Sequence, residues 1–301
     1  MEKYNLTLKD INIGIKRILA EAYATSNVCD NPELIYITGG PGAGKTSIER
    51  YLKQELLKKG IHPFIINSDK IAKFHPCYDA AIEELPEECY RITRQFVRPA
   101  NPIIFDELMK RKIAIINENT LDHGSADIEQ AKKFRNAGYK IYINIMATDL
   151  FESRISCYER EAATLQLGLT PRGCSSQNQF RMYNSFIEGV KKLEQLNLVD
   201  QINVFIRGKN ISQNPILTYK TGDIKHRDFL EAISVERKKQ REELLMKPLD
   251  YYNRIKRTIE VIKEYGKNSI LTSNTIKELK ELAKDFSTEY NNQKHNLKEE
   301  R

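Results

Sequence analysis

The sequence predicts an α/β fold in which a parallel sheet is flanked by helices and followed by a C-terminal helical extension. Short apolar runs rich in β-branched residues alternate with longer segments of helical spacing, a pattern typical of a parallel sheet with right-handed crossovers. A glycine-rich loop joins the first of these runs to a helix. Beyond residue 221 the strand-like runs stop and polar helical patterns follow. We therefore predict an α/β domain over residues 1–221, including an N-terminal helix at 7–24, and a helical extension over 222–301.

The composition restricts the class of protein. Of the 301 residues, 40% are hydrophobic and 30% are charged, which suits a chain with a substantial core and a polar surface. The net charge of +7 suits an anionic ligand, but it is spread along the chain, so we do not expect a nucleic-acid partner. The five cysteines form no C-x-x-C pair, which predicts free thiols in a reducing compartment. We see neither a signal peptide nor an apolar run of the roughly 20 residues that cross a bilayer, so we expect a cytoplasmic protein without a membrane partner.

Each regular element is predicted from its local pattern. The N-terminal helix has apolar residues on one face and Thr7 in the N-cap position. The helix after the glycine-rich loop stops at Gly60, and a crossover helix at 129–137 stops at Gly138. Apolar runs predict six strands, at residues 34–38, 63–67, 113–117, 139–146, 202–206 and 216–219.

Two further segments have helical patterns with interruptions. Residues 79–112 contain Pro99 and Pro102, which we expect to bend the helix or to start a new one. Residues 149–198 are rich in arginine, and the sequence LGLTPRG at 167–173 predicts a loop in their middle.

The C-terminal extension combines polar helices with one apolar stripe. A helix over 229–245 carries the basic cluster RKKQR at 237–241, and another helix is expected over 275–286. Between them lies a stripe with spacings of three and four residues, formed by Tyr252, Ile255, Ile259 and Ile262. The stripe is too narrow for a domain core, so we expect it to pack on the α/β domain or on a neighbouring helix. Two interpretations of the charged faces stay open: a helical hairpin with solvated faces, or a docking surface for a partner.

The loop after the first strand carries the clearest chemical signal. Its sequence GGPGAGKTS contains the pattern G-x-x-x-x-G-K-[ST] between a strand and a helix. Glycines allow consecutive backbone N–H groups to surround a polyphosphate, and the following helix adds its positive end. Lys45 can reach the β- and γ-phosphates, and the Thr46 hydroxyl can ligate Mg²⁺. We predict that ATP is bound by Gly39, Gly40, Pro41, Gly42, Ala43, Gly44, Lys45, Thr46 and Ser47.

Two carboxylates follow strands of the predicted sheet. Asp69 comes after the strand at 63–67, and Glu118 comes after the strand at 113–117. Ligands of open parallel sheets bind at the carboxyl ends of the strands, so both side chains are expected near the phosphates. There Glu118 would hold a magnesium-bound water or a substrate hydroxyl. Each also has a simpler interpretation, Asp69 as a helix N-cap and Glu118 as a solvated loop acid.

Arginines are expected near the transferring group, because phosphoryl transfer favours cations there and arginine suits this better than lysine. The segment 149–198 contains four of them: Arg154, Arg160, Arg172 and Arg181. Since most arginines on helices are solvated, a surface role is the alternative for each.

Several short motifs surround these residues. The sequence FIINSD at 64–69 is followed after five residues by His75-Pro76. Glu118-Asn119-Thr120 follows the third strand, and Tyr158-Glu159 and Thr170-Pro171 lie in the arginine-bearing segment. Together they resemble the zeta toxins, in which a strand-end aspartate, a His-Pro pair and a Glu-Gly-Thr triplet occur at matching positions.

The resemblance, which runs from about residue 31 to about residue 219, implies a function. Zeta toxins are the kinase components of bacterial toxin–antitoxin pairs and phosphorylate UDP-N-acetylglucosamine. By this resemblance Asp69 is the general base, and Lys45 and Thr46 hold ATP and Mg²⁺. Contacts with the UDP-sugar would come from Glu118, Thr120 and His75.

The sequence departs from the family in three respects. Asn119 stands where the family has a glycine, and the carboxylate that the family carries on the helix before this strand falls near Pro102. The family's two catalytic arginines, directly before Tyr-Glu and Thr-Pro, have no counterpart at those positions. We assign their role to nearby arginines: Arg160 and Arg172, with Arg154 behind them.

We therefore predict an ATP-dependent phosphotransferase that acts on a hydroxyl of UDP-N-acetylglucosamine or a related nucleotide-sugar, stops bacterial growth and has a cognate antitoxin. One alternative is a kinase of another hydroxyl compound, such as an antibiotic, NAD or a polynucleotide end. Another is a nucleotide-dependent interaction module. The guanine motif Asn/Thr-Lys-x-Asp, which would favour such a module, does not occur in the sequence, and the strand-end Asp69 favours a kinase.

Overall fold

The computed structural model describes residues 4–85, 88–122, 124–171, 175–208, 213–266 and 270–299. The contacts within it group the chain into two units. Unit 1 comprises Met1–Gly39, Gly44–Met146 and Ser185–Phe229. Unit 2 comprises Gly40–Ala43, Ala147–Asn184 and Leu230–Arg301. The functional domains assigned from the sequence, 1–221 and 222–301, stay a prediction.

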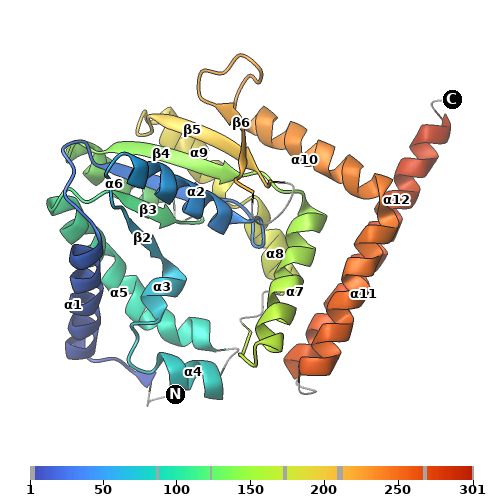
Figure 1. Ribbon diagram of the computed structural model, residues 1–301, viewed down its shortest axis with the longest axis horizontal. Helices are drawn as coiled ribbons and strands as arrows, with labels where there is room; N and C mark the ends of the chain where they lie inside the picture. Colours follow the sequence, from blue (N-terminus) through green and yellow to red (C-terminus); the bar gives the residue numbers. More distant parts are fainter. Residues whose placement is uncertain are drawn as a thin grey trace. The chain divides into compact units, whose positions relative to one another are not determined.

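A six-stranded sheet forms the centre of unit 1, with the order β2-β3-β1-β4-β5-β6 (Figure 1). Its strands are β1 (Glu33–Thr38), β2 (Phe64–Asn67), β3 (Ile115–Glu118), β4 (Lys140–Met146), β5 (Gln201–Ile206) and β6 (Ile216–Lys220). The neighbouring strands from β2 to β5 pair in parallel, which confirms the predicted fold class. β1 lies between β3 and β4 and is buried from Leu34 to Thr38, as a strand covered on both faces should be.

The last strand departs from the parallel arrangement. β6 pairs antiparallel with β5, with a register shift between Val204 and Phe205. A parallel crossover takes about a dozen residues or more, and fewer than that lie between Ile206 and Ile216. The short connection therefore returns the chain in the opposite direction.

Helices surround this sheet. They are α1 (Leu8–Thr25), α2 (Lys45–Lys58), α3 (Ser68–Ala72), α4 (Tyr78–Glu84), α5 (Cys89–Lys110), α6 (Ser125–Asn136) and α9 (Phe186–Gln195). The predicted N-cap of α1 is confirmed: Asp10 N–H donates to Thr7 Oγ1 at 3.2 Å, and Thr7 N–H donates back to the Asp10 carboxylate at 3.0 Å. This capping box satisfies two backbone donors that the first turn of α1 leaves without helical partners.

The expected start of a new helix at Pro99 and Pro102 is wrong, because α5 runs through both prolines. Each proline removes one N–H from the helix and so frees the carbonyl group four residues earlier. These carbonyls belong to Gln95 and Arg98, which are exposed, so water can take the place of the missing donors. The opposite face of α5 is buried without a break, and this burial keeps the helix in one piece.

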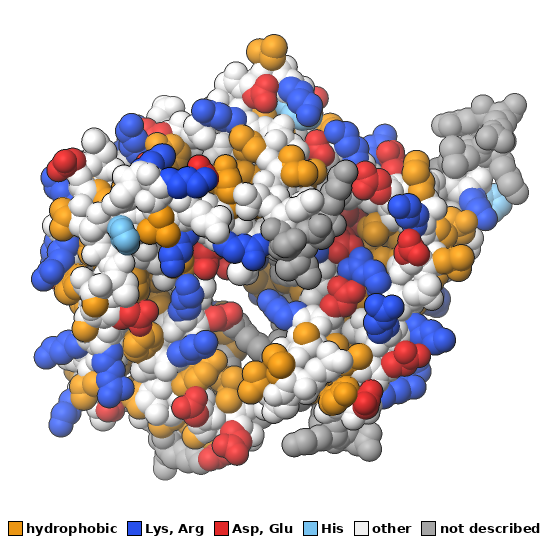
Figure 2. All heavy atoms as spheres, viewed as in Figure 1, with side chains coloured by type: hydrophobic (Ala, Val, Ile, Leu, Met, Phe, Trp, Pro, Cys, Tyr) orange, Lys and Arg blue, Asp and Glu red, His pale blue; other side chains and the backbone are white. Residues whose placement is uncertain are grey.

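Unit 2 is built from helices. They are α7 (Leu150–Gln166), α8 (Ser176–Tyr183), α10 (Phe229–Met246, whose first residue groups with unit 1), α11 (Pro248–Tyr265) and α12 (Ile270–Glu299). The helix expected over 275–286 is therefore part of a longer one. No helix in the described ranges is long and apolar enough to cross a membrane. Basic and acidic side chains are interspersed over the face drawn in Figure 2, in agreement with a net charge spread along the chain.

The core of unit 2 joins α7 to the C-terminal helices. The predicted apolar stripe does pack on neighbouring helices, since Ile255 and Ile262 of α11 are buried in one cluster with residues of α7 and α12. Phe286 of α12 is its most enclosed aromatic side chain. Its ring centre lies 5.2 Å from that of Phe151 and 4.2 Å from that of Tyr251. Such offset and edge contacts add to the free energy of burial.

Part of the charged surface of the extension is paired with α7, although many of its charged side chains are exposed. Arg254 of α11 donates to Glu152 at 2.6 Å and to Glu159 at 2.8 Å, and both acceptors lie on α7. Burial disfavours the charge of Arg254, but the hydrogen bonds to Glu159 and Glu152 outweigh it and raise the pKa of the guanidinium. The two helices are thus joined by paired charges beside their apolar contacts.

We predict that Phe286→Ala lowers the free energy of unfolding by about 3–5 kcal/mol, because a fully buried aromatic side chain is replaced by a cavity. Lys280→Ala on the same helix is the matched control, since Lys280 is exposed, and it should change the stability by less than about 0.5 kcal/mol. Urea denaturation followed by circular dichroism measures both. Equal denaturation midpoints for the two variants would contradict the packing of α12 on α7.

Candidate functional site

The glycine-rich loop joins β1 to α2 in the conformation that a phosphate loop requires. Gly44 is the N-cap of α2 and has φ +99°, a left-handed conformation that suits glycine. Among the described residues, no side chain caps this end of α2. The positive end of the helix dipole lies at this terminus and would attract an anion.

The tip of the loop, Gly40–Ala43, approaches the backbone of α7 within unit 2. A Cβ atom on Gly42 would lie 2.2 Å from the carbonyl oxygen of Ser153 and 2.8 Å from Cys157 Sγ. Gly42 also has φ +70°. Only glycine fits both the conformation and the space, although the motif itself leaves position 42 open.

Lys45 lies beside Glu118, so the structure brings two of the predicted site residues together. Lys45 Nζ donates to Gly39 O at 3.2 Å and lies 3.5 Å from Glu118 Oε1. The strand register explains the meeting, because Glu118 of β3 is paired with Ile37 of β1, just before the loop. Glu118 is the last residue of β3 and is ion-paired, so its interpretation as a solvated loop acid is wrong.

Asp69 follows the strand next to β3. Asn67 of β2 is paired with Glu118, and Asp69 lies two residues further on, exposed in the first turn of α3. The N-cap of this helix is Asn67, whose Oδ1 accepts the Lys70 N–H at 2.8 Å. The interpretation of Asp69 as the N-cap is therefore wrong. The carboxyl ends of β1, β3 and β2 are adjacent. β3 ends in Glu118, and β2 and β1 lead into the segments that carry Asp69 and Lys45.

Two residues near these strand ends were missed by the sequence analysis. Glu49 lies one turn after Lys45 on α2, with its carboxylate 3.6 Å from Lys70 Nζ. Burial raises its pKa, and the nearby Glu118 adds to the effect. Arg207 directly follows β5, and a Cβ on Gly44 would lie 3.0 Å from its Nε. Helical spacing from Lys45 would have found Glu49, and the strand-end rule would have found Arg207.

The loop after β3 is shaped by Asn119, at the position where the resemblance implies a glycine. The Asn119 N–H donates to Ile37 O at 3.0 Å, and its side-chain Oδ1 accepts the Leu121 N–H at 2.9 Å. This Asx turn fixes the backbone around Thr120, whose hydroxyl donates to Asp122. Thr120 is thereby held next to Glu118 at the end of the strand.

His75 is part of the interior of unit 1. Its side chain is 2% exposed, and its Nδ1 accepts the Cys77 N–H at 3.0 Å, so the proton of the neutral ring is on Nε2. Nε2 has no hydrogen-bond partner among the described residues. Burial lowers the pKa of His75, although the nearby Asp10 opposes this. Its contact with substrate stays a prediction.

The candidate arginines have different surroundings. Arg154 is 2% exposed, pairs with Asp285 at 2.9 Å and lies over the ring of Phe180, so it is part of the interior of unit 2. Arg160 and Arg181 are exposed on α7 and α8. Arg172 lies outside the described residues. The role of Arg160 and Arg172 in phosphoryl transfer stays a prediction.

A buried parallel strand, followed by a glycine loop of the pattern G-x-x-x-x-G-K-[ST] and then by a helix, defines a protein of the phosphate-loop α/β class. The particular family is shown by comparison with known families. The family model described as Zeta toxin matches residues 18–215. The chain belongs to the zeta toxin family.

Individual relatives agree with this assignment. The chain is 20% identical to Toxin zeta of Streptococcus pyogenes over 204 residues, which cover 67% of this chain and 70% of that protein. It is similar in structure to the PezAT chromosomal toxin–antitoxin system of Streptococcus pneumoniae, with a TM-score of 0.67, 19% identity and coverage of 86% of this chain and 100% of that one. The AvrRxo1-ORF1:AvrRxo1-ORF2 complex is similar when solved with sulphate ions (TM-score 0.56, 12% identity, 90% and 89% covered) and with ATP (TM-score 0.53, 12% identity, 91% and 87% covered).

We predict that Gly42→Ala displaces the phosphate loop and weakens nucleotide binding by about 5- to 150-fold, as overpacking against a helix backbone commonly costs about 1–3 kcal/mol. Gly60→Ala is the matched control. Gly60 has a similar φ of +74°, but nothing lies within 4 Å of the added Cβ, so its substitution strains the backbone and causes no clash. Calorimetric titration with ADP measures both variants. Equal affinities in the two would show that the approach to α7 does not shape the loop.

We predict that His75 makes the fold sensitive to acid. Burial lowers the pKa of His75 below its unfolded value of 6.5. As the pH falls below 6.5, the unfolded chain therefore binds a proton at His75 while the folded chain keeps this side chain neutral. The contribution of neutral His75 to the free energy of unfolding is complete above pH 6.5. It falls as the pH is lowered, by at most about 1.4 kcal/mol per pH unit. His75→Asn keeps an acceptor for the Cys77 N–H and does not titrate. Urea denaturation between pH 7.5 and 5.5 should show a steeper loss for the wild type, and parallel profiles would contradict this role.

Proposed function

We propose that the protein is an ATP-dependent phosphotransferase that transfers the γ-phosphate to a hydroxyl of UDP-N-acetylglucosamine or a related nucleotide-sugar. The observation that carries the proposal is the pairing of Lys45 with Glu118, at the edge of the sheet where Asp69 also follows its strand. A phosphate-binding cation paired with one strand-end carboxylate, with a second carboxylate after the adjacent strand, suits the activation of a hydroxyl. A simple nucleotide-binding module has no need of a base at that place.

In the proposed mechanism the chain positions the reactants and neutralises charge. The loop N–H groups and Lys45 hold the phosphates of ATP. The carboxylate of Asp69 takes the proton of the acceptor hydroxyl, the acceptor oxygen bonds to the γ-phosphorus, and the bond from that phosphorus to the β–γ bridging oxygen breaks to release ADP. Arg160 and Arg172 would face the transferring group.

The residues present fit a magnesium ion. The Thr46 hydroxyl is exposed in the first turn of α2 and is the kind of oxygen donor that Mg²⁺ takes. Among the described residues no three acidic, histidine or cysteine side chains form a metal cluster, so phosphate oxygens and water would complete the shell. When bound there, the ion would withdraw negative charge from the β- and γ-phosphates.

Glu118 is the proposed contact to the acceptor, with Thr120 and His75. In the structure Lys45 donates to Gly39 O and is ion-paired with Glu118. A bound triphosphate would draw the lysine to itself, because phosphate carries more negative charge than either present partner. Glu118 would then be available to a sugar hydroxyl, which links ATP binding to acceptor binding.

The biological setting is proposed from the relatives. One curated relative is a zeta toxin, and one solved relative comes from a toxin–antitoxin system, so we propose a cognate antitoxin for this chain. We propose residues 1–221 as the kinase domain and the cytoplasm as the location, since ATP is abundant there. A different hydroxyl acceptor is the second candidate. It is favoured by the exposed Pro102 on α5, near the position where the resemblance implies a carboxylate.

We predict that Asp69→Asn slows phosphoryl transfer by about 10²–10⁴-fold while ATP still binds, because the amide cannot accept the acceptor's proton. The full-length protein is incubated with γ-labelled ATP and a panel of nucleotide-sugars, and the products are separated. Asp79→Asn is the matched control, an exposed aspartate in the first turn of α4, and should transfer phosphate at the wild-type rate. Lys45→Ala should lose ATP binding itself.

Two results would change the proposal. Transfer by Asp69→Asn at the wild-type rate would remove Asp69 as the base. A wild-type protein that binds ATP but labels none of the nucleotide-sugars would favour another acceptor. Expression of the wild type should stop bacterial growth, and Asp69→Asn should not.

A further inference from the structure

The tip of the phosphate loop is held by two hydrogen bonds within unit 2. Thr148 Oγ1 donates to Ala43 O at 2.8 Å, and Ser153 Oγ donates to Pro41 O. A peptide group is planar and its C=O and N–H point in opposite directions. When the carbonyl groups of Pro41 and Ala43 are fixed, the N–H groups of Gly42 and Gly44 are fixed as well. These are loop donors that the motif directs at phosphate.

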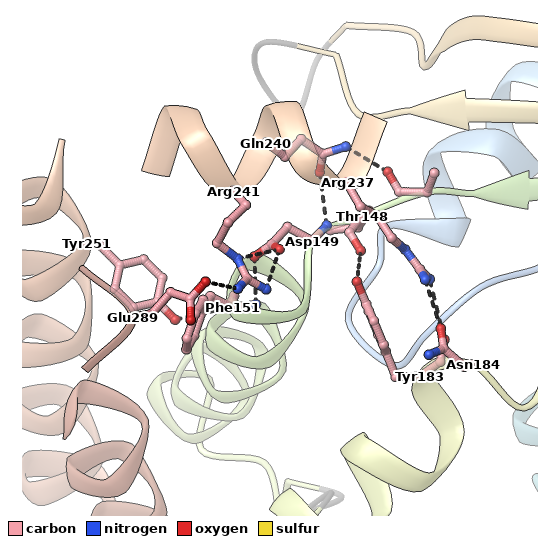
Figure 3. Close-up of polar contacts among 11 residues, drawn as sticks. Thr148, Asp149, Phe151, Tyr183, Asn184, Arg237, Gln240, Arg241, Tyr251 and Glu289 are labelled. Atoms are coloured by element: carbon pink, nitrogen blue, oxygen red, sulfur yellow. Dashed lines mark hydrogen bonds and ion pairs between the residues drawn. The ribbon is translucent and has the colours of Figure 1, made fainter. Parts of the chain in front are cut away.

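Thr148 is in turn held by Gln240 of α10, in the C-terminal extension. Gln240 Nε2 donates to Ala147 O at 2.8 Å, and Gln240 Oε1 accepts the Asp149 N–H at 3.0 Å (Figure 3). One side-chain amide thus bridges the residues on both sides of Thr148, as a neighbouring strand would. The peptide groups on both sides of Thr148 cannot turn without breaking a buried hydrogen bond.

Arg237, one turn earlier on α10, acts on the loop through Tyr183. Its guanidinium lies 4.0 Å from the centre of the Tyr183 ring and donates to Asn184 Oδ1 at 2.8 Å (Figure 3). The Tyr183 hydroxyl donates to Thr148 O at 2.8 Å. The ring also faces the loop, since a Cβ on Gly40 would lie 3.0 Å from Tyr183 Cδ2. Burial raises the pKa of Tyr183 to about 12, so the hydroxyl keeps its donor proton at neutral pH.

From these contacts we infer that α10 supports the phosphate loop, with Gln240 and Arg237 as positioning residues that act through Thr148 and Tyr183. The inference rests on the proposed function, because it takes the loop as the nucleotide site. α10 lies outside the residues 18–215 that match the family model. The apparent affinity for nucleotide is lower when a smaller fraction of the molecules has a loop that is competent to bind. α10 raises that fraction.

A direct ligand-binding role for this part of α10 fits the charges less well. A cavity of about 560 Å³ lies beside Tyr183 and Arg237. Arg241 in its wall already pairs with Asp149 at 2.7 Å and with Glu289 at 3.2 Å (Figure 3). The charges of the lining balance: three are basic, Arg237, Lys238 and Arg241, and three are acidic, Asp149, Glu242 and Glu289. Balanced, paired charges suit structural support better than the capture of an anion.

The test compares Gln240→Ala with Lys239→Ala in the full-length chain. Gln240→Ala should weaken the binding of ADP and of inorganic tripolyphosphate by about the same factor, roughly tenfold, because a buried donor and a buried acceptor lose their partner. Tripolyphosphate lacks the nucleoside, so an equal factor places the effect at the phosphate-binding part of the loop. Lys239 is the next residue on the helix and is exposed, so its variant should bind as the wild type does. Calorimetry measures the affinities.

Tyr183→Phe is the second variant. It removes only the hydroxyl that holds Thr148 O and keeps the ring, so it should fold and weaken both ligands by roughly three- to tenfold. If Gln240→Ala yields no folded protein, the Tyr183→Phe variant by itself tests the inference. Affinities within about twofold of the Lys239→Ala control would overturn the inference. So would a loss confined to ADP, which would locate the effect at the nucleoside. A wild-type protein that binds neither ligand would instead overturn the proposed function.

Discussion

The structure depends on one close approach, between Gly42 of the phosphate loop and the backbone of α7. There is no room for a Cβ on Gly42, because the carbonyl oxygen of Ser153 occupies its place. A contact between two backbones cannot be relieved by a change of rotamer, so the loop takes its shape from the position of α7. That position is set by the core that α7 shares with α11 and α12, where Phe286 packs against Phe151. A rigid helix thus transmits the packing of the C-terminal helices to the loop.

The strand register is the corresponding constraint in unit 1. Ile37 of β1 and Asn67 of β2 are both paired with Glu118 of β3, so three strands end at the same level. A shift of β3 by one residue would turn Glu118 to the other face of the sheet and separate it from Lys45. The register is fixed by apolar side chains buried along β1 and β3. The chemistry at the strand ends therefore depends on the same burial that stabilises the sheet.

Local sequence patterns were sufficient wherever an element is specified by residues close together in the chain. The N-cap at Thr7, the glycine loop and the strand end before Asp69 are of this kind. α5 shows the limit of local patterns. Pro99 and Pro102 lie on its exposed face, and burial of the opposite face outweighs the free energy that the two lost hydrogen bonds cost. Both prolines are compatible with the helix because they lie on its exposed face. The sequence pattern alone does not reveal which face of the helix is exposed.

The role of Gln240 could not have been predicted, because it bonds to residues 147 and 149, more than 90 positions earlier in the chain. The basic composition around it favours a solvated face, since burying an arginine is costly. Here Arg237 and Arg241 are stacked on aromatic rings, and Arg241 is paired with two carboxylates, so the cost is offset. A helix that only extended a domain into solvent would gain nothing from such a set of partners. The partners of α10 also hold the tip of the phosphate loop, so the free energy that fixes α10 contributes to the readiness of the loop for phosphate.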